Sequence, residues 1–592
     1  MCGIAGIMTR DGQAPDESSL ERLTDALAHR GPDGRGRYVK DGVGLAHTRL
    51  SIIDLETGDQ PLLAEARNGS QAALVANGEI YNYVELRDSL PGVKFRTRSD
   101  CEPPLHLYLR HGQDFVSHLR GMYAIAIYDP GEGKLVLARD PFGIKPLYYA
   151  ETETAFVFAS EPQALVRAGL VGASLNPRAR GELLQLQFTT GGETAFAGIH
   201  RVLPGETLEI KVGRITGRRR SAALPEDGPA PLTKLAALAE LDSRLNDAVG
   251  VHQRSDVPYG MFFSGGVDSS VLLAMMSRLN ERPVIAFTAG FPGSSVHDER
   301  EHARAVARAA GADHHEVEFG EEDFWSLLPE IAAAMDDPAA DYAVLPSWKL
   351  AAAARQGGLK VVLAGEGGDE VFAGYSRYRG ALRPWPFRRA LRRKGIFDGL
   401  GVLREMPGPW RDGIRAAEEA AKPAWTSLMA AQATDCADWL PHDLLGKLDR
   451  CLMAHGVEGR VPFLDPKLSA FAFRLPDALK VHRGNGKWLL RRWLETALPE
   501  SRPFSRKRGF TVPVGEWIAA RGRELGPLVA AQPGVEEICR PGAVEALFAS
   551  PGARAGKAAW TLLFYALWHR THMLGRSPAG GVFETLSPQG NL

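Results

Sequence analysis

A loop rich in glycine and serine is the first stretch whose residue types could do chemistry. Residues 264–270 read Ser-Gly-Gly-Val-Asp-Ser-Ser, between apolar runs at 257–263 and 271–276. A strand, a Gly/Ser turn and a helix start form an anion site, because the first N–H groups of a helix lack internal partners. Asp268 would repel a phosphate unless Mg²⁺ lies between them. The loop therefore predicts a site for the pyrophosphate part of a nucleotide with a metal ion; a plain turn with an N-cap serine is the alternative.

A second glycine-rich loop carries acids. Residues 365–370 read Gly-Glu-Gly-Gly-Asp-Glu and follow an apolar strand at 360–364. Three acids in a phosphate-facing loop are costly unless a metal or a cationic substrate balances them. We therefore expect Asp369 to hold Mg²⁺ together with Asp268, and Glu366 to lie close to the reacting carbonyl. A solvated acidic turn is the alternative.

Cys2 is a candidate nucleophile at the start of the chain. Because Met1 precedes a small residue, we expect its removal, which leaves Cys2 with a free α-amine. The pKa of such an amine is about 7.7–8.0, so it can act as a general base for the adjacent thiol near pH 7. The thiolate is then the attacking species. A buried N-terminal cysteine without a catalytic role is the alternative.

Polar clusters at 29–33, 49–54 and 77–82 accompany Cys2. In the third cluster, the side-chain N–H of Asn77 and the backbone N–H of Gly78 could form an oxyanion hole. The guanidinium of Arg49 could pair with a substrate carboxylate in fork geometry. Asp100 could hold a substrate ammonium. For each cluster alone, a turn with satisfied polar groups is the alternative.

The elements that must position these residues fall into two groups. Short strands separated by turn residues dominate the first 210 residues and predict a layered α+β domain. Residues 214–231, rich in Arg, Gly, Ala and Pro, predict a linker. From residue 232 helices alternate with strands, which predicts a parallel sheet with nucleotide sites at the carboxyl ends of its strands. The expected domains are therefore 2–213 and 232–592.

The composition is that of an enzyme without a nucleic-acid or membrane partner. The 592 residues include 70 Lys and Arg against 71 Asp and Glu, and the five cysteines are scattered without metal-ligand spacing. The first residues lack the pattern of a signal peptide, and no apolar run reaches the ~20 residues that span a bilayer. We expect a cytoplasmic protein that can form a homodimer.

The N-terminal motifs together resemble the class II glutamine amidotransferase domain. They are the opening Met-Cys-Gly-Ile-Ala-Gly, the three polar clusters, Ser99 with Asp100, and the segment Arg-Asp-Pro-Phe-Gly-Ile-Lys-Pro-Leu-Tyr-Tyr at 139–149. The resemblance implies an N-terminal-nucleophile hydrolase fold, an α/β/β/α sandwich that hydrolyses glutamine to glutamate and ammonia. It implies that Cys2 is the nucleophile, that Asn77 and Gly78 are the oxyanion donors, and that the residues holding glutamine are Arg49, Glu79 and Asp100.

The loops at 264–270 and 365–375, with the motifs at 459–465 and 487–491, resemble the ATP-pyrophosphatase domain of glutamine-hydrolysing asparagine synthetase. This implies an adenine nucleotide α-hydrolase-like parallel sheet with extra helices. It also implies that ATP and aspartate form β-aspartyl-AMP and pyrophosphate, and that ammonia from the first site then displaces AMP. Lys487 would neutralise charge on the α-phosphate, and Glu366 would accept a proton from the attacking ammonia. The implied nucleotide-binding residues are Phe263, Ser264, Gly265, Gly266, Asp268, Ser269, Ser270, Ala289, Ala364 and Gly365.

One departure and three alternatives accompany this resemblance. Ala364 stands where the family commonly has Ser or Thr, so its side chain offers no hydroxyl to ATP. A related amidotransferase that amidates another carboxylate is the near alternative. A β-lactam synthetase would have lost its N-terminal nucleophile, so Cys2 argues against it. A non-catalytic sensor would show damage at Cys2, Asp268, Glu366 or Lys487, and the sequence shows none.

Overall fold

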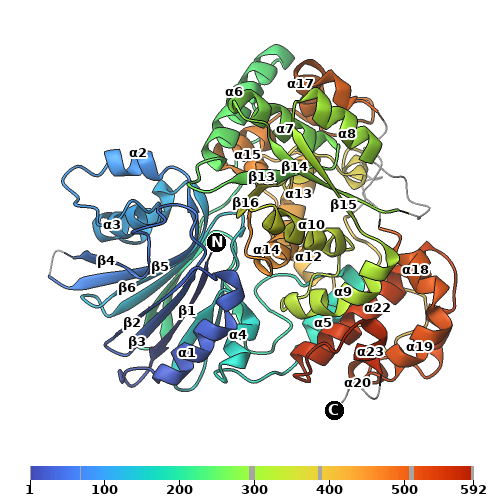
Figure 1. The fold of residues 1–592 in the computed structure, drawn as a ribbon, viewed down its shortest axis with the longest axis horizontal. Coiled ribbons are helices and arrows are strands. Elements are labelled where there is room, and N and C mark those ends of the chain that lie inside the picture. Colours follow the sequence, from blue (N-terminus) through green and yellow to red (C-terminus); the bar gives the residue numbers. More distant parts are fainter. Residues whose placement is uncertain (1, 67–68, 293–299, 385–389, 506–511, 588–592) are drawn as a thin grey trace.

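The chain folds into a β-rich N-terminal domain and a larger C-terminal domain that lie side by side (Figure 1). The computed structural model describes residues 2–66, 69–292, 300–384, 390–505 and 512–587.

The N-terminal domain contains two six-stranded sheets in which all neighbouring strands are antiparallel. The first sheet has the order β10 (His200–Arg201), β8 (Tyr148–Glu151), β9 (Ala155–Ala159), β1 (Gly3–Thr9), β3 (Val43–Arg49) and β2 (Gly34–Lys40). The second has the order β12 (Arg214–Arg220), β11 (Glu206–Lys211), β7 (Lys134–Arg139), β6 (Gly121–Asp129), β5 (Gln71–Ile80) and β4 (Leu62–Glu65).

The two sheets pack face to face through alternate strand residues. Ile4 of β1, Val43 of β3 and Val75 of β5 share one buried apolar cluster, because successive strand residues point to opposite faces. Helices cover the outer faces: α1 (Glu17–Ala26) and α4 (Pro162–Arg167) lie on the first sheet, and α3 (Glu102–His111) lies on the second, followed by η2 (Gly112–His118). The short helices η1 (Ala28–Arg30) and α2 (Tyr83–Asp88) complete the layers. The predicted α/β/β/α sandwich is confirmed.

The predicted linker at 214–231 was wrong for its first seven residues. Residues 214–220 form β12, which pairs with β11 at the edge of the second sheet. The Arg-rich run has no apolar alternation, but backbone pairing does not require it, and charged side chains suit a sheet edge. The guanidinium of Arg218 also donates to Glu206 and to the hydroxyl of Tyr149, at 2.9 and 2.8 Å.

The C-terminal domain is organised around a five-stranded sheet whose pairings are all parallel. Its order is β15 (Asp313–Glu318), β14 (Ile285–Gly290), β13 (Tyr259–Phe262), β16 (Val361–Leu363) and β17 (Glu458–Arg460). The predicted parallel sheet is confirmed. The ends of β13, β14 and β16 bring both glycine-rich loops to one edge.

Helices surround this sheet. In chain order, the helices before and between β13, β14, β15 and β16 are α6 (Lys234–His252), α7 (Val267–Leu279), α8 (Arg300–Ala309), α9 (Glu321–Ala334) and α10 (Val344–Gln356). Between β16 and β17 lie α11 (Gly368–Val371), η3 (Ser376–Gly380), α12 (Asp412–Glu419), α13 (Ser427–Thr434), η4 (Asp435–Leu445) and α14 (Gly446–Met453). After β17 follow η5 (Pro462–Leu464), α15 (Pro466–Phe473), α16 (Asp477–Lys480), α17 (Trp488–Ala497) and η6 (Pro499–Ser501).

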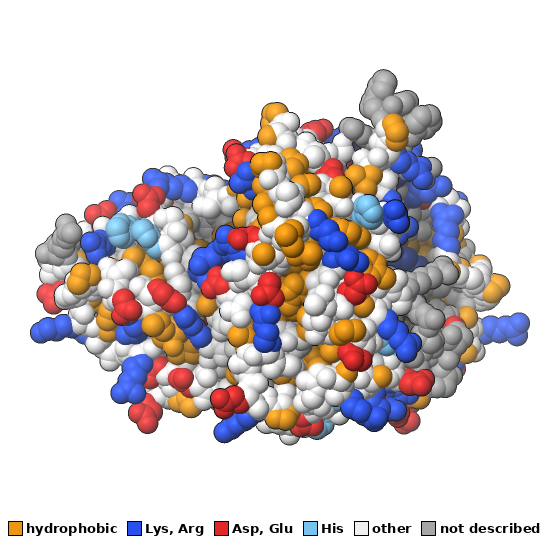
Figure 2. All heavy atoms as spheres, turned by 90° about the horizontal axis from the view of Figure 1, so that it is seen from above, with side chains coloured by type: hydrophobic (Ala, Val, Ile, Leu, Met, Phe, Trp, Pro, Cys, Tyr) orange, Lys and Arg blue, Asp and Glu red, His pale blue; other side chains and the backbone are white. Residues whose placement is uncertain are grey.

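A last group of helices packs around the 20-residue helix α22 (Ala553–His572), which also contacts α9 and α5 (Pro177–Leu186). The group contains α18 (Val514–Ala520), α19 (Gly522–Ala530), α20 (Pro533–Glu536), α21 (Ala543–Phe548) and α23 (Val582–Leu586). Within the described ranges, no helix combines the length and apolar character that crossing a membrane requires. Figure 2 shows acidic and basic side chains interspersed on the face that it displays.

The two domains meet through both apolar and charged contacts. Leu50 and Ile52 of the N-terminal domain belong to the same buried cluster as Leu452 and Val461 of the C-terminal domain. Buried ion pairs cross the same boundary, for example Arg30 with Asp449 at 2.8 Å and Arg120 with Asp465 at 2.7 Å. Breaking such a pair leaves an uncompensated buried charge, so we expect the domains to behave as one unit.

Candidate functional site

Cys2 lies at the start of β1, where neighbouring elements hold its backbone. Its N–H donates to Oδ1 of Asn77 at 3.1 Å, and its carbonyl accepts from Nε of Arg30 at 3.2 Å. The residue is 8% exposed. Burial raises the pKa of the Cys2 thiol, so the resting thiol is protonated and a nearby base must take its proton before attack.

Asn77 and Gly78 stand next to Cys2 on β5. Asn77 is fully buried, and none of the described residues accepts a hydrogen bond from its Nδ2. A buried donor without a partner is costly, so such a group is a candidate for a ligand contact. A Cβ added to Gly78 would lie 2.1 Å from the carbonyl oxygen of Met122, so only glycine fits there. Asn77 therefore contacts the backbone of Cys2, and Gly78, the other predicted oxyanion donor, follows Asn77 on β5.

Glu79 and Asp100 add buried carboxylates to the same site. The backbone N–H of Ile80 donates to Oδ2 of Asp100 at 2.8 Å. Burial raises the pKa of Asp100 to about 6 and the pKa of Glu79 well above its ordinary value. Buried carboxylates are stabilised by a cationic partner, so this cluster is suited to a substrate ammonium.

Arg49, at the end of β3, is close enough to Cys2 to lower the pKa of its thiol, although less than burial raises it. Its guanidinium pairs with Oδ1 of Asp59 at 2.7 Å and donates to the carbonyl of Asp54. The Asp59 side chain is 80% exposed, and exposed ion pairs contribute little. Arg49 remains the predicted partner of a substrate carboxylate, and the aspartate that pairs with it here faces solvent.

The loop at 264–270 has the form of an anion cradle at the start of α7. Gly265 has φ of +72°, a conformation that glycine adopts without strain. The hydroxyls of Ser264 and Ser269 lie 3.2 Å apart. The buried hydroxyl of Ser270 has no hydrogen-bond partner in the described part of the chain. These donors and the N-terminus of the 13-residue helix α7 fit the predicted pyrophosphate contact.

The two glycine-rich loops touch each other through Asp268. A Cβ on Gly368 would lie 2.7 Å from the Asp268 carboxyl group, and one on Gly365 would lie 3.1 Å from its Cβ. The other predicted nucleotide residues lie on the same sheet. The backbone N–H of Phe263 donates to the carbonyl oxygen of Phe287 on β14 at 2.8 Å. Ala289 belongs to β14, and Ala364 directly follows β16.

Lys487 joins both predicted metal ligands. Its ammonium contacts Oδ2 of Asp268 and lies 2.6 Å from Oδ1 of Asp369. Burial alone would lower the pKa of Lys487, but the two carboxylates raise it. Lys487 also has φ of +55°, and such uncommon conformations cluster at functional sites.

The donor set is compatible with Mg²⁺. The carboxylates of Asp268 and Asp369 converge on the Lys487 ammonium. In the described ranges, no group of three or more His, Cys, Asp or Glu side chains could hold a metal by itself. Mg²⁺ is commonly held by one or two carboxylates plus substrate phosphates. A nucleotide would therefore have to supply the remaining ligands.

Glu366 is partly exposed at the start of the second loop. Burial raises the pKa of its carboxyl group, and the ammonium of Lys447 opposes that rise. Lys447 forms an ion pair with Asp341 at 3.0 Å. No sequence motif points to Lys447, because a lone lysine in a long helical region stands outside any short pattern.

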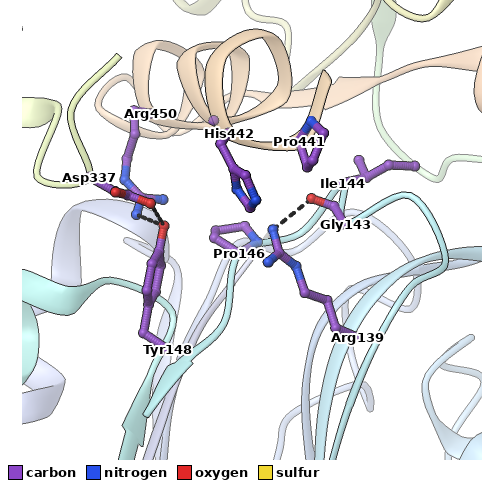
Figure 3. Close-up of a pocket in the computed structure, with 10 residues that line it drawn as sticks. Arg139, Gly143, Ile144, Pro146, Tyr148, Asp337, Pro441, His442 and Arg450 are labelled. Atoms are coloured by element: carbon purple, nitrogen blue, oxygen red, sulfur yellow. Dashed lines mark hydrogen bonds between the residues drawn. The ribbon is translucent and has the colours of Figure 1, made fainter. Parts of the chain in front are cut away.

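A narrow cavity between the domains coincides with neither predicted site. Figure 3 shows side chains from both domains around it, with Tyr148 close to Asp337 and Arg450. The buried Nε2 of His442 has no hydrogen-bond partner among the residues that the structure describes. The lining residues are Arg139, Gly143, Ile144, Pro146, Tyr148, Asp337, Pro441, His442, Gly446 and Arg450.

Two family models match the chain in succession. The model described as a glutamine amidotransferase domain matches residues 1–220, and the model described as asparagine synthase matches residues 240–570. Together they include both groups of predicted site residues.

Curated proteins are similar over most of the chain. A putative asparagine synthetase (glutamine-hydrolyzing) of Mycobacterium tuberculosis strain ATCC 25618 / H37Rv is 34% identical, with 96% of this chain and 97% of that protein covered. Asparagine synthetase (glutamine-hydrolyzing) 1 of Bacillus subtilis strain 168 is 31% identical, with 96% of each covered. A protein of Gibberella zeae named amidase chry2 is 30% identical, with 82% of this chain and 84% of that protein covered.

Proposed function

Because this chain belongs to the asparagine synthase family, we propose that it makes asparagine from aspartate and ATP with ammonia taken from glutamine. The order of the two domains supports this proposal, since one half carries a candidate amide-hydrolysing site and the other a candidate nucleotide site. A cytoplasmic location and a homodimer remain predictions from the sequence.

In the first half-reaction, the Cys2 thiolate attacks the side-chain amide carbon of glutamine. The free α-amine left by loss of Met1 takes the thiol proton. Asn77 and Gly78 donate to the developing oxyanion, ammonia leaves, and water hydrolyses the thioester to glutamate. The observation that carries the proposal is the buried Asn77 amide, whose Oδ1 accepts from Cys2 while its Nδ2 has no partner in the described chain.

Glutamine is bound by charge complementarity. We assign its ammonium to Glu79 and Asp100, two buried carboxyl groups that interact with the same guanidinium, that of Arg460. We assign its carboxylate to Arg49, which exchanges the exposed Asp59 for the substrate.

In the second half-reaction, an oxygen of the aspartate β-carboxylate attacks the α-phosphorus of ATP and pyrophosphate leaves. The loop at 264–270 binds the departing pyrophosphate, and the Lys487 ammonium offsets charge that develops on the α-phosphate. Mg²⁺, when bound with ATP by Asp268 and Asp369, neutralises phosphate charge. Lys487 contacts both carboxylates in this structure, so nucleotide binding must redistribute these contacts.

Ammonia then attacks the acyl carbon of β-aspartyl-AMP, AMP leaves, and Glu366 accepts the proton that ammonia loses. The raised pKa of Glu366 makes it a stronger base than an ordinary carboxylate. Ammonia must arrive unprotonated, which requires a route that excludes water. The apolar contacts between the domains support such a route.

Product analysis with the full chain tests the proposal. With glutamine, ATP, Mg²⁺ and aspartate, we expect asparagine, AMP, pyrophosphate and glutamate in equal amounts. Omitting aspartate should stop AMP formation. Formation of ADP and phosphate in place of AMP and pyrophosphate would contradict the adenylate mechanism.

A second candidate is amidation of another carboxylate by the same two half-reactions. In its support, a relative that is 30% identical carries a name other than asparagine synthetase, amidase chry2. A panel of amino acids and other carboxylic acids, each tested for stimulation of AMP formation, separates the two. Stimulation by another acid with no response to aspartate would favour the second candidate.

A further inference from the structure

Arg460, at the end of β17 in the C-terminal domain, reaches into the predicted glutamine site of the N-terminal domain. Its Nη2 lies 3.1 Å from Oε1 of Glu79. Its Nε donates to Oε1 of Glu458 at 2.6 Å. The arginine is fully buried, so the contact with Glu79 is not weakened by solvent as a surface pair would be.

The backbone of the same residue contacts the other predicted site. Leu363 on β16 pairs with Arg460 on β17, and the N–H of Ala364 donates to the Arg460 carbonyl at 2.8 Å. Gly365 and Glu366 follow immediately. One residue therefore contacts a predicted glutamine ligand through its side chain and the Glu366 loop through its backbone.

The guanidinium is fixed in place. Nη1 donates to the carbonyls of His252 and Arg254, at 2.9 and 2.6 Å, and the ring of Tyr81 lies 5.8 Å from its central carbon. A planar guanidinium with this many partners cannot rotate without breaking several of these contacts. A change in its contact with Glu79 must therefore be shared with β17 or with these carbonyls.

The charges around Arg460 give a reason why the contact should respond to substrate. Glu79, Asp100 and Glu458 all interact electrostatically with this one guanidinium, so the buried carboxylates outnumber it. An incoming glutamine ammonium would add a second positive charge beside Glu79 and so change the electrostatic force on Arg460, which holds that carboxyl group in place. Binding at one site thus changes the forces on a residue that supports the other.

We propose that Arg460 is a positioning residue that holds Glu79 for glutamine and links occupancy of that site to the Glu366 loop. The inference rests on the proposed function, because it takes glutamine to be the ligand of Glu79.

The test measures coupling between the sites in the full chain carrying Cys2→Ala, which should bind glutamine without hydrolysing it. With aspartate and Mg²⁺ present throughout, calorimetry gives the Kd for glutamine with and without an ATP analogue that has a methylene group between the α- and β-phosphorus atoms. We expect the Kd to change by about fivefold or more, and the affinity for the analogue to change by the same factor when glutamine is added.

Arg460→Lys should weaken glutamine binding by about tenfold, because lysine cannot keep the fork contacts, and should bring the coupling factor close to one. Arg120→Lys is the matched control: Arg120 also forms ion pairs across the domains, with Asp465 and Asp247, but does not contact Glu79. Three results would each overturn the inference. They are unchanged coupling in Arg460→Lys, an equal loss of coupling in Arg120→Lys, and no coupling in the parent protein.

Kinetics with Cys2 intact separate positioning from a general loss of structure. A structural defect lowers glutamine-dependent and ammonium-dependent synthesis together. The proposal instead predicts that kcat/KM for glutamine falls about tenfold more than kcat/KM for ammonium chloride.

If Arg460→Lys does not fold, Glu458→Gln provides the test of coupling between the two sites. It removes a competing carboxylate charge and should change the coupling factor, and an unchanged factor would overturn the inference. Failure of the proposed function is distinguishable, since it appears as a wild-type protein that releases no glutamate from glutamine.

Discussion

Asn77→Asp would separate the two contacts that the Asn77 amide provides. Oδ1 accepts from the Cys2 N–H at 3.1 Å, and Nδ2 is buried without a partner among the described residues. An aspartate oxygen can still accept from Cys2, but no donor remains for an oxyanion. The substitution thus keeps the nucleophile in place and removes the stabilisation of the intermediate.

The size of the effect follows from the burial of this donor. Nδ2 is already stripped of water, so it needs no desolvation when charge develops on the substrate oxygen. Loss of one such donor costs about 10²–10³ in kcat, or about 2.7–4 kcal/mol. A carboxylate also repels the oxyanion, so we expect Asn77→Asp at the upper end of that range. Asn77→Ala should lose a similar factor and also displace Cys2.

The assay is glutamate release from glutamine, with asparagine formation from ammonium chloride as the control in the same preparation. Glutaminase activity should fall by the factor above, while ammonium-dependent synthesis should stay within about twofold, since Asn77 takes no part in the second half-reaction. A variant that releases glutamate within about threefold of the wild-type rate would refute the assignment of Nδ2 to the oxyanion hole.

Three further predictions concern the other assigned groups. Cys2→Ala should abolish glutamate release yet leave synthesis from ammonium chloride, measured as asparagine; loss of both activities would contradict separate sites. Glu366→Gln should stop asparagine formation from either nitrogen source and spare glutamate release, and near-normal synthesis would remove Glu366 from the mechanism. Because burial raises the pKa of Asp100 to about 6, its carboxylate is ionised above that pH and neutral below it. The kcat/KM for glutamine hydrolysis should therefore fall as the pH drops through about 6, and Asp100→Asn, with lower activity throughout, should lack that step.

The sequence predicted those features that depend on local pattern. Short strands separated by turn residues predicted a layered first domain, because burial of a strand face shows in the pattern of the strand's own residues. Gly/Ser and Gly/acid turns after apolar strands located the loops at 264–270 and 365–370. The contact between them through Asp268 also follows from pattern, since carboxyl ends of parallel strands share one edge.

Contacts between the domains could not be predicted in this way. Arg30 pairs with Asp449, and Arg460 with Glu79, across hundreds of residues. Periodicity tells which face of an element is buried, but not which distant element covers it. The motif at 459–465 was noted only for its resemblance, and nothing in its residue types indicates that Arg460 points into the other domain.

The domain boundary also holds the proposed nucleophile in position. The guanidinium of Arg30 donates to the Cys2 carbonyl at 3.2 Å and forms ion pairs with Glu161 and with Asp449 of the other domain. Because all of these groups are buried, removing Asp449 would leave Arg30 with a charge that Glu161 alone must balance. The backbone of Cys2 is thus fixed through a residue anchored in the C-terminal domain. Together with Arg460 on Glu79, this places two contacts from the C-terminal domain on the proposed glutamine site, so the geometry of the proposed glutamine hydrolysis depends on the domain proposed to bind the nucleotide.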